Sequence, residues 1–157
     1  RTPSRIMDRA VSMAQAHNLP VTPVSSVREG ERDPMIEHAE PSELTQRTAE
    51  AVAAVHEERL GRLAVIVAAE RVGAIAAALR AHGGLPAVGV GSAGVDDEIA
   101  VMTAQDAKGL EFDAVVIVEP AELIDAHGAG DLYVAMSRST QHLGVVHARD
   151  LPAGIAD

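Results

Sequence analysis

The chain has 157 residues, enough to bury one core, so residues 1–157 are predicted to form a single domain. Its formal net charge of −10, with one Phe, one Tyr and no Trp, disfavours an autonomous nucleic-acid-binding module, because phosphate backbones are repelled and bases have no stacking platform. The absence of cysteine excludes disulfides and thiolate metal sites, and every apolar run is far shorter than the roughly 20 residues of a membrane span, so a cytoplasmic location is expected.

The first third of the chain predicts two helices separated by extended chain. Thr2-Pro3 is a hydroxyl cap followed by proline, and apolar residues recur at helical spacing after it, which predicts a helix over about 3–17. Residues 19–41 are rich in proline and predict extended chain with short strands at most. Ser42 is predicted to cap a helix that ends at Leu60-Gly61 and places Leu44, Thr48, Val52 and Val55 on one face.

Strands and helices alternate in the remainder. Residues 63–69, LAVIVAA, form a continuous apolar run that is typical of a strand covered on both faces. The further predicted elements are a helix over 71–82, strands over 86–90, 99–103 and 114–118, a helix over 131–140, and a strand over 143–148. This alternation predicts an α/β fold in which a mostly parallel sheet is sandwiched between helices.

The segment Gly89-Val-Gly-Ser-Ala-Gly94 matches the glycine pattern of dinucleotide-binding loops. Such a loop must open a helix whose amino end faces the pyrophosphate. Here the glycines lead through acidic residues into another apolar run, so we expect an ordinary flexible turn.

The segment TAQDAKGLEFD, residues 103–113, follows a predicted parallel strand, at the sheet edge where α/β proteins build their sites. One interpretation is a solvated loop tip. In the other, Lys108 and Gly109 approach an anion closely, while Glu111 accepts hydrogen bonds from sugar hydroxyls. Together these groups would suit a nucleotide.

In DLYVAMSRST, helical spacing points Leu132, Ala135 or Met136, and Ser139 toward the core. Arg138 then lies on a different face of the predicted helix. It is either a solvated surface arginine or, beside a triphosphate, a group that neutralises the charge developing in phosphoryl transfer.

Several catalytic patterns are missing from the sequence. No phosphate loop of the form GxxxxGK[ST] occurs, so the chain is not a whole P-loop ATPase. The histidines lack metal-ligand spacing, and no metal site is predicted. Ser137 and Ser139 lack the GxSxG setting of a hydrolase nucleophile.

Three segments together resemble the later motifs of superfamily 1 helicases of the UvrD, Rep and PcrA type. TAQDAKGLEFDAVVIV resembles motif V, DLYVAMSRSTQHLGVV resembles motif VI, and the opening RTPSRIM resembles the tail of motif IV, all in the family order. The resemblance runs from residue 1 to about residue 151. It implies the C-terminal, RecA-like lobe of a helicase without the lobe that carries the phosphate loop, so the chain is expected to be a fragment of a longer protein.

The resemblance also implies roles in nucleotide binding. Arg1 matches the motif IV arginine that contacts the γ-phosphate, and Arg138 matches the motif VI arginine finger. Glu111 matches the carboxylate that faces the ribose, beside Lys108 and Gly109. The implied cofactor is ATP with Mg²⁺, the metal being held mainly by the missing first lobe, and the isolated chain is expected to be inactive.

The implied partners are the N-terminal RecA-like lobe of the same protein and nucleic acid, which Thr103 and Gln105 would contact. One alternative is the HelD-type branch that acts on bacterial RNA polymerase, favoured by the VVHARDLP ending and by Gln105, where the family usually has histidine. The other is a noncatalytic protein-interaction module with a degenerate RecA-like fold, favoured by the negative charge and the missing phosphate loop. The sequence leaves these alternatives open.

Overall fold

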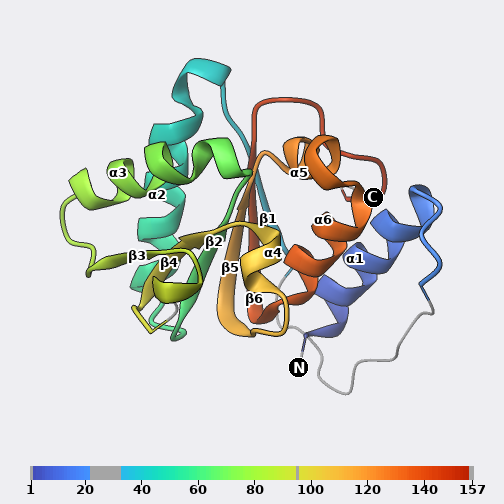
Figure 1. Ribbon diagram of the computed structural model, residues 1–157, viewed down its shortest axis with the longest axis horizontal. Coiled ribbons are helices and arrows are strands. Elements are labelled where there is room, and N and C mark those ends of the chain that lie inside the picture. Colours follow the sequence, from blue (N-terminus) through green and yellow to red (C-terminus); the bar gives the residue numbers. More distant parts are fainter. Residues whose placement is uncertain (1, 22–32, 95, 156–157) are drawn as a thin grey trace.

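The computed structural model describes residues 2–21, 33–94 and 96–155. These residues form a six-stranded sheet and the helices packed on it (Figure 1). The strands are β1 (Met35–His38), β2 (Leu63–Ile66), β3 (Val88–Val90), β4 (Ile99–Met102), β5 (Phe112–Val118) and β6 (Ser139–His147). Their order is β1-β6-β5-β2-β4-β3, and each pairing between neighbours is parallel. The predicted fold class, a mostly parallel sheet sandwiched by helices, is confirmed.

Helices cover both faces of this sheet, as Figure 1 shows. They are α1 (Ser4–Ala16), α2 (Leu44–Glu57), α3 (Val72–Ala81), α4 (Ala104–Ala107), α5 (Pro120–His127) and α6 (Ala129–Ser137), with short 3-10 turns at Pro41–Glu43, Ala69–Arg71 and Ser92–Gly94. Helices α2 and α3 pack on one face, and α1, α4, α5 and α6 pack on the other. Within the described ranges, no helix has the length and apolar character needed to cross a membrane.

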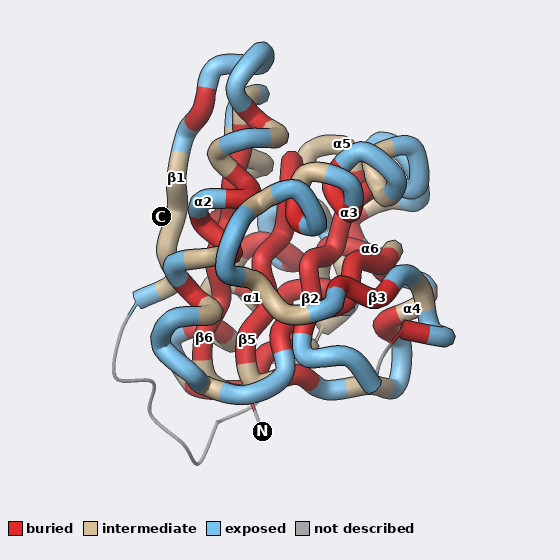
Figure 2. Tube along the Cα trace, turned by 90° about the vertical axis from the view of Figure 1, so that its left-hand side faces the viewer, coloured by how far each residue is buried: buried red, intermediate tan, exposed pale blue. Residues whose placement is uncertain are grey.

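The sheet has a separate apolar core on each face because successive strand residues point to opposite sides. In β2, Ala64 and Ile66 join the core under α1 and α6, whereas Leu63 and Val65 join the core under α2 and α3. Strands β2 and β4 are therefore buried along their length, and β5 is buried except at Asp113, so the central strands are mostly red in Figure 2. This two-sided burial explains why they read as unbroken apolar runs in the sequence.

The predicted helix faces are correct, but two predicted caps are wrong. The four α2 residues expected on one face, Leu44, Thr48, Val52 and Val55, are all buried. Ser42 lies inside the 3-10 turn Pro41–Glu43 and caps nothing, because α2 begins only at Leu44. The N-cap of α1 is Pro3, since the Thr2 hydroxyl donates instead to the Ser137 carbonyl at 2.8 Å.

The connections differ most from the prediction. Helix α2 ends at Glu57, and the left-handed residue after it is Arg59, with φ 54°, rather than Gly61, with φ 130°. The sequence did not predict α4 or α5, and α6 ends at Ser137, so that β6 begins at Ser139 inside the predicted final helix.

The glycine segment 89–94 forms a turn, as predicted, and opens no helix that could face a phosphate. Gly89 lies in β3, and a Cβ built on it would come within 2.5 Å of the Gly94 carbonyl oxygen. The glycines therefore permit two backbone segments to touch where the chain turns from β3 toward β4.

Candidate functional site

The segments that resemble motifs V and VI meet at the edge of the sheet where its strands begin, the amino edge. Glu111 directly precedes β5 and Arg138 directly precedes β6. The first residues of these strands, Phe112 and Ser139, are partners in the parallel pairing, and the Phe112 N–H donates to the Arg138 carbonyl at 2.9 Å. Two positions that lie far apart in the sequence are thereby fixed side by side.

This placement corrects the prediction that Lys108, Gly109 and Glu111 lie at the carboxyl edge of the sheet. Only Thr103 lies there, directly after β4. Because β4 and β5 are parallel, the chain must return across the sheet between them, which it does through α4 and a turn at Gly109, with φ 80°. Lys108, Gly109 and Glu111 are exposed on the approach to the amino edge.

Arg138 caps the C-terminal end of α6 and lies half-buried against the loop before β5. Its guanidinium group donates three hydrogen bonds, to the Val134 carbonyl at 3.2 Å, to the Leu110 carbonyl at 3.4 Å and to the Ser137 hydroxyl at 3.2 Å. All three acceptors are neutral, and the described part of the chain shows no ion pair between Arg138 and a carboxylate. The charge of Arg138 therefore stays available to an anion.

The N-terminal segment reaches the same place. Thr2 is buried, and its hydroxyl bonds the carbonyl of Ser137, the residue before Arg138. Arg1 itself lies outside the described residues, so its predicted contact with a phosphate stays a prediction.

Thr103 and Gln105, the predicted nucleic-acid residues, lie at the carboxyl edge and not beside Arg138. Thr103 caps α4 by accepting from the Asp106 N–H, while the Asp106 carboxylate accepts from the Thr103 N–H, both at 3.3 Å. Gln105 donates to the Asp131 carboxylate at 2.5 Å. Both residues line a small hollow of about 50 Å³.

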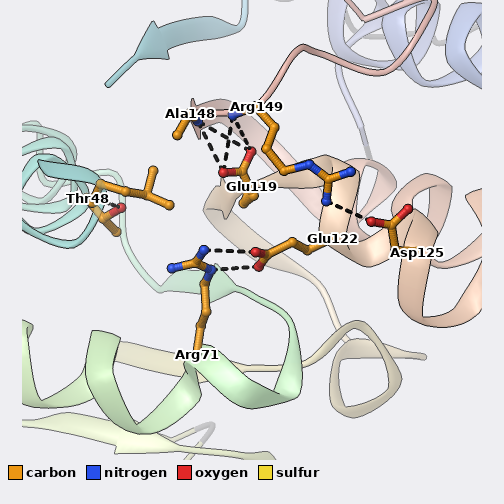
Figure 3. Close-up of polar contacts among 8 residues, drawn as sticks. Thr48, Arg71, Glu119, Glu122, Asp125, Ala148 and Arg149 are labelled. Carbon is orange, nitrogen blue, oxygen red and sulfur yellow. Dashed lines mark hydrogen bonds and ion pairs between the residues drawn. The ribbon is translucent and has the colours of Figure 1, made fainter. Parts of the chain in front are cut away.

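A second polar cluster at the carboxyl edge, drawn in Figure 3, was not predicted. Arg71, after β2, donates to Glu122 of α5 at 2.6 and 2.8 Å. Arg149 donates to Asp125 at 2.7 Å, and a hollow of about 630 Å³ lies among these side chains. The pKa of the Arg71 guanidinium is raised, mainly because it donates hydrogen bonds to Glu122. Burial of the group acts in the opposite direction but is the smaller effect.

Glu119 lies beside this second cluster, between the end of β5 and the start of α5. Its side chain is buried, its φ of 53° is left-handed, and its carboxylate accepts the backbone N–H groups of Ala148 and Arg149 at 3.1 to 3.3 Å. A left-handed glutamate is unusual. No local sequence pattern indicates the contacts of the second cluster, because residues such as Arg71 and Glu122 are 51 positions apart in the chain.

Metal ligands do not cluster in the described part of the chain. Across residues 2–21, 33–94 and 96–155, no group of three or more His, Asp or Glu side chains is placed to hold a metal ion.

Comparisons with known proteins support the resemblance seen in the sequence. Residues 98–146, which include the segments from Thr103 to Asp113 and from Asp131 to Gln141, match the model of the UvrD-like helicase C-terminal domain family. No curated protein matches the sequence. Among solved structures, the C-terminal domain of a possible DNA helicase from Lactobacillus plantarum WCFS1 matches with a TM-score of 0.72 and 21% identity, over 99% of this chain and 91% of that chain. The predicted resemblance is thus confirmed: residues 98–146 match the model of the UvrD-like helicase C-terminal domain family, and nearly the whole chain shares the fold of the C-terminal domain of the possible DNA helicase from Lactobacillus plantarum.

Proposed function

We propose that this chain is the second motor lobe of an ATP-dependent superfamily 1 helicase or translocase, and that its amino edge supplies charged groups to ATP held by another lobe. The observation that carries the proposal is the environment of Arg138. Among the described residues, its guanidinium group is oriented by neutral oxygen acceptors only, so none of them compensates its charge at the place where the segments that resemble motifs V and VI meet.

An arginine in this setting suits phosphoryl transfer. Negative charge spreads over the oxygens of the transferred phosphoryl group in the transition state, and an arginine from a second lobe stabilises it by a factor of roughly 10³ to 10⁵ in rate. Arg71 could not do the same without first leaving Glu122, whereas Arg138 would exchange only neutral partners.

The groups beside Arg138 suit the remainder of a nucleotide. Lys108 is exposed on the loop before β5, and Gly109 leaves the backbone there uncovered. The exposed Glu111 carboxylate suits ribose hydroxyls, which donate hydrogen bonds to acceptors of this kind.

The rest of the ATP site belongs, in this proposal, to the N-terminal RecA-like lobe of the same protein. That lobe would hold Mg²⁺ and the β- and γ-phosphates, since the sequence has no phosphate loop. Closure of the two lobes brings Arg138 to the γ-phosphate, and hydrolysis releases them, which converts chemistry into movement along nucleic acid. Contact of Thr103 and Gln105 with nucleic acid, and the alternative of RNA polymerase as the target, stay predictions.

The test is Arg138→Ala in the full-length protein. We expect ATP hydrolysis to fall by roughly 10³-fold or more while ATP still binds, because the phosphate-loop lobe is untouched. Arg149→Ala, which removes an exposed arginine at the opposite edge, is the matched control and should retain hydrolysis.

Wild-type turnover by Arg138→Ala would refute the proposal. A full-length sequence without a phosphate loop would favour the noncatalytic protein-interaction module instead. The 157-residue chain alone is expected to hydrolyse no ATP.

A further inference from the structure

Asp113 is a polar residue in a strand that is otherwise buried. It is the second residue of β5 and is half-exposed, whereas the other residues of this strand are buried. A carboxylate in such a strand is costly unless its oxygens accept hydrogen bonds. The Asp113 carboxylate accepts two, from the Arg62 backbone N–H at 2.7 Å and from the Gln141 side-chain amide at 3.0 Å.

Gln141 extends the contact to a third segment. The same side-chain nitrogen donates to the Leu60 carbonyl at 3.2 Å. The Asp113 and Gln141 side chains therefore tie together the turn before β2, the start of β5 and the start of β6. We call these contacts the Asp113–Gln141 clamp.

A β-bulge aims Gln141 at Asp113. The pairing of β5 with β6 runs from Phe112 opposite Ser139 to Ala114 opposite His142, so β6 contains one extra residue at this point. Such a bulge bends its strand and redirects a side chain. The bulge is also held by the Thr140 hydroxyl, which donates to the Phe112 carbonyl at 3.2 Å.

The turn before β2 fits tightly against this carboxylate. Gly61 has φ 130°, and a Cβ built on it would lie 2.2 Å from Asp113 Oδ2, so only glycine leaves room for the clamp. The next residue, Arg62, places its guanidinium group 5.2 Å from the centre of the Phe112 ring.

The clamp is adjacent in sequence and in space to the groups proposed to contact ATP. Phe112, whose carbonyl the bulge holds, follows Glu111 directly and donates its N–H to the Arg138 carbonyl. We propose that Asp113 and Gln141 are positioning residues, which hold the backbones of Glu111 and Arg138 at the spacing that ATP requires. This inference rests on the proposed function.

The clamp can be tested first on the chain itself. Gln141→Met removes both donated hydrogen bonds at nearly constant size. We expect the NMR signal of the Arg138 Nε–H to shift and broaden, while the melting temperature falls by only a few degrees. Gln46→Met, at an exposed glutamine of α2 whose side chain donates to Glu50 at 3.4 Å, is the matched control and should leave the Arg138 signal unchanged.

A second measurement links position to catalysis. In the full-length protein, Gln141→Met should lower kcat for ATP hydrolysis by about 10- to 100-fold and leave KM for ATP within about twofold, because misplacement by about 1 Å costs rate more than binding. Asp113→Asn, which keeps the size of the side chain, should also lower kcat. It is the second variant to be measured if Gln141→Met does not fold.

The inference is wrong if the Arg138 signal and kcat are both unchanged, or if activity falls only in proportion to the folded fraction. Its failure is distinguishable from failure of the proposed function. An inactive Arg138→Ala with a fully active Gln141→Met would defeat the clamp alone, whereas a fully active Arg138→Ala would defeat the proposed function.

Discussion

Arg138 and Arg71 have the same side chain in opposite electrostatic settings. Arg71 donates twice to the Glu122 carboxylate, which neutralises its charge, whereas Arg138 donates to three neutral oxygens. A neutral acceptor orients a guanidinium group without cancelling its charge. Residue identity alone does not distinguish the two arginines, and only their partners show which one can serve an anion.

The glycine of the clamp provides a prediction at this scale. Gly61→Ala should lower the free energy of unfolding by about 1 to 3 kcal/mol, because alanine is strained at a positive φ and its methyl group would displace the Asp113 carboxylate. Gly73→Ala, at a helical glycine of α3 with no atom within 4 Å of the new methyl group, should raise it by about 0.5 to 1 kcal/mol. Urea denaturation of both variants measures the difference. Equal effects of the two substitutions would show that the close approach at Gly61 has no energetic consequence.

Among the elements, those defined by local pattern were predicted well. The faces of α1 and α2 and the buried central strands follow from apolar spacing, which is set by neighbours in the chain. Helix α5 was missed because it starts at Pro120, with only Glu119 between it and the end of β5 and no loop sequence to mark the boundary. The break there is made by Glu119 in a left-handed conformation that its buried hydrogen bonds to Ala148 and Arg149 stabilise.

The ion pair between Arg71 and Glu122 provides a prediction at the scale of elements. It joins the 3-10 turn Ala69–Arg71, beyond the end of β2, to α5, beyond the end of β5. About a third of the Arg71 side chain and a quarter of the Glu122 side chain remain exposed, at 31% and 26%, so solvent weakens the pair. A double-mutant cycle with Arg71→Met and Glu122→Gln should give a coupling energy of about 0.5 to 1 kcal/mol.

This coupling should be the same throughout the neutral pH range as far as Arg71 is concerned. Its pKa is raised in the folded protein, so its stabilisation is complete at every pH below the unfolded-state pKa and is lost only at extreme alkaline pH. The more exposed pair of Arg149 with Asp125, tested by the same cycle, should show a smaller coupling. A coupling of zero for Arg71 and Glu122 would mean that α5 is held in place by its apolar contacts alone.

The molecule as a whole has two cores that share one sheet. Leu79 of α3 lies in one core, while Tyr133 of α6 packs against the other and donates its hydroxyl hydrogen to the Met7 sulfur at 3.8 Å. Tyr133 is the only tyrosine and the sequence has no tryptophan, so tyrosine fluorescence reports on a single face of the sheet.

If the two cores unfold together, a cavity made in one core should lower the stability that a probe in the other core reports. Leu79→Ala should lower the free energy of unfolding by about 2 to 5 kcal/mol, and the transitions followed by tyrosine fluorescence and by far-UV circular dichroism should shift by the same amount. A fluorescence transition that stays in place while the circular dichroism transition moves would show that the faces unfold separately.

The alternation of strands and helices, the burial of the central strands and the segments that resemble helicase motifs follow from the sequence alone, because each is written in contiguous residues. The sequence also predicted Glu111 and Arg138 as nucleotide-binding residues, which stays a prediction. Tertiary structure decided which edge of the sheet these two residues share, because a parallel crossover carries the chain from Thr103 at one edge to Glu111 at the other. It also decided the partners of Arg138 and Asp113, since hydrogen bonds between segments such as Leu110 with Arg138 and Asp113 with Gln141 exist only after the strands have paired in register.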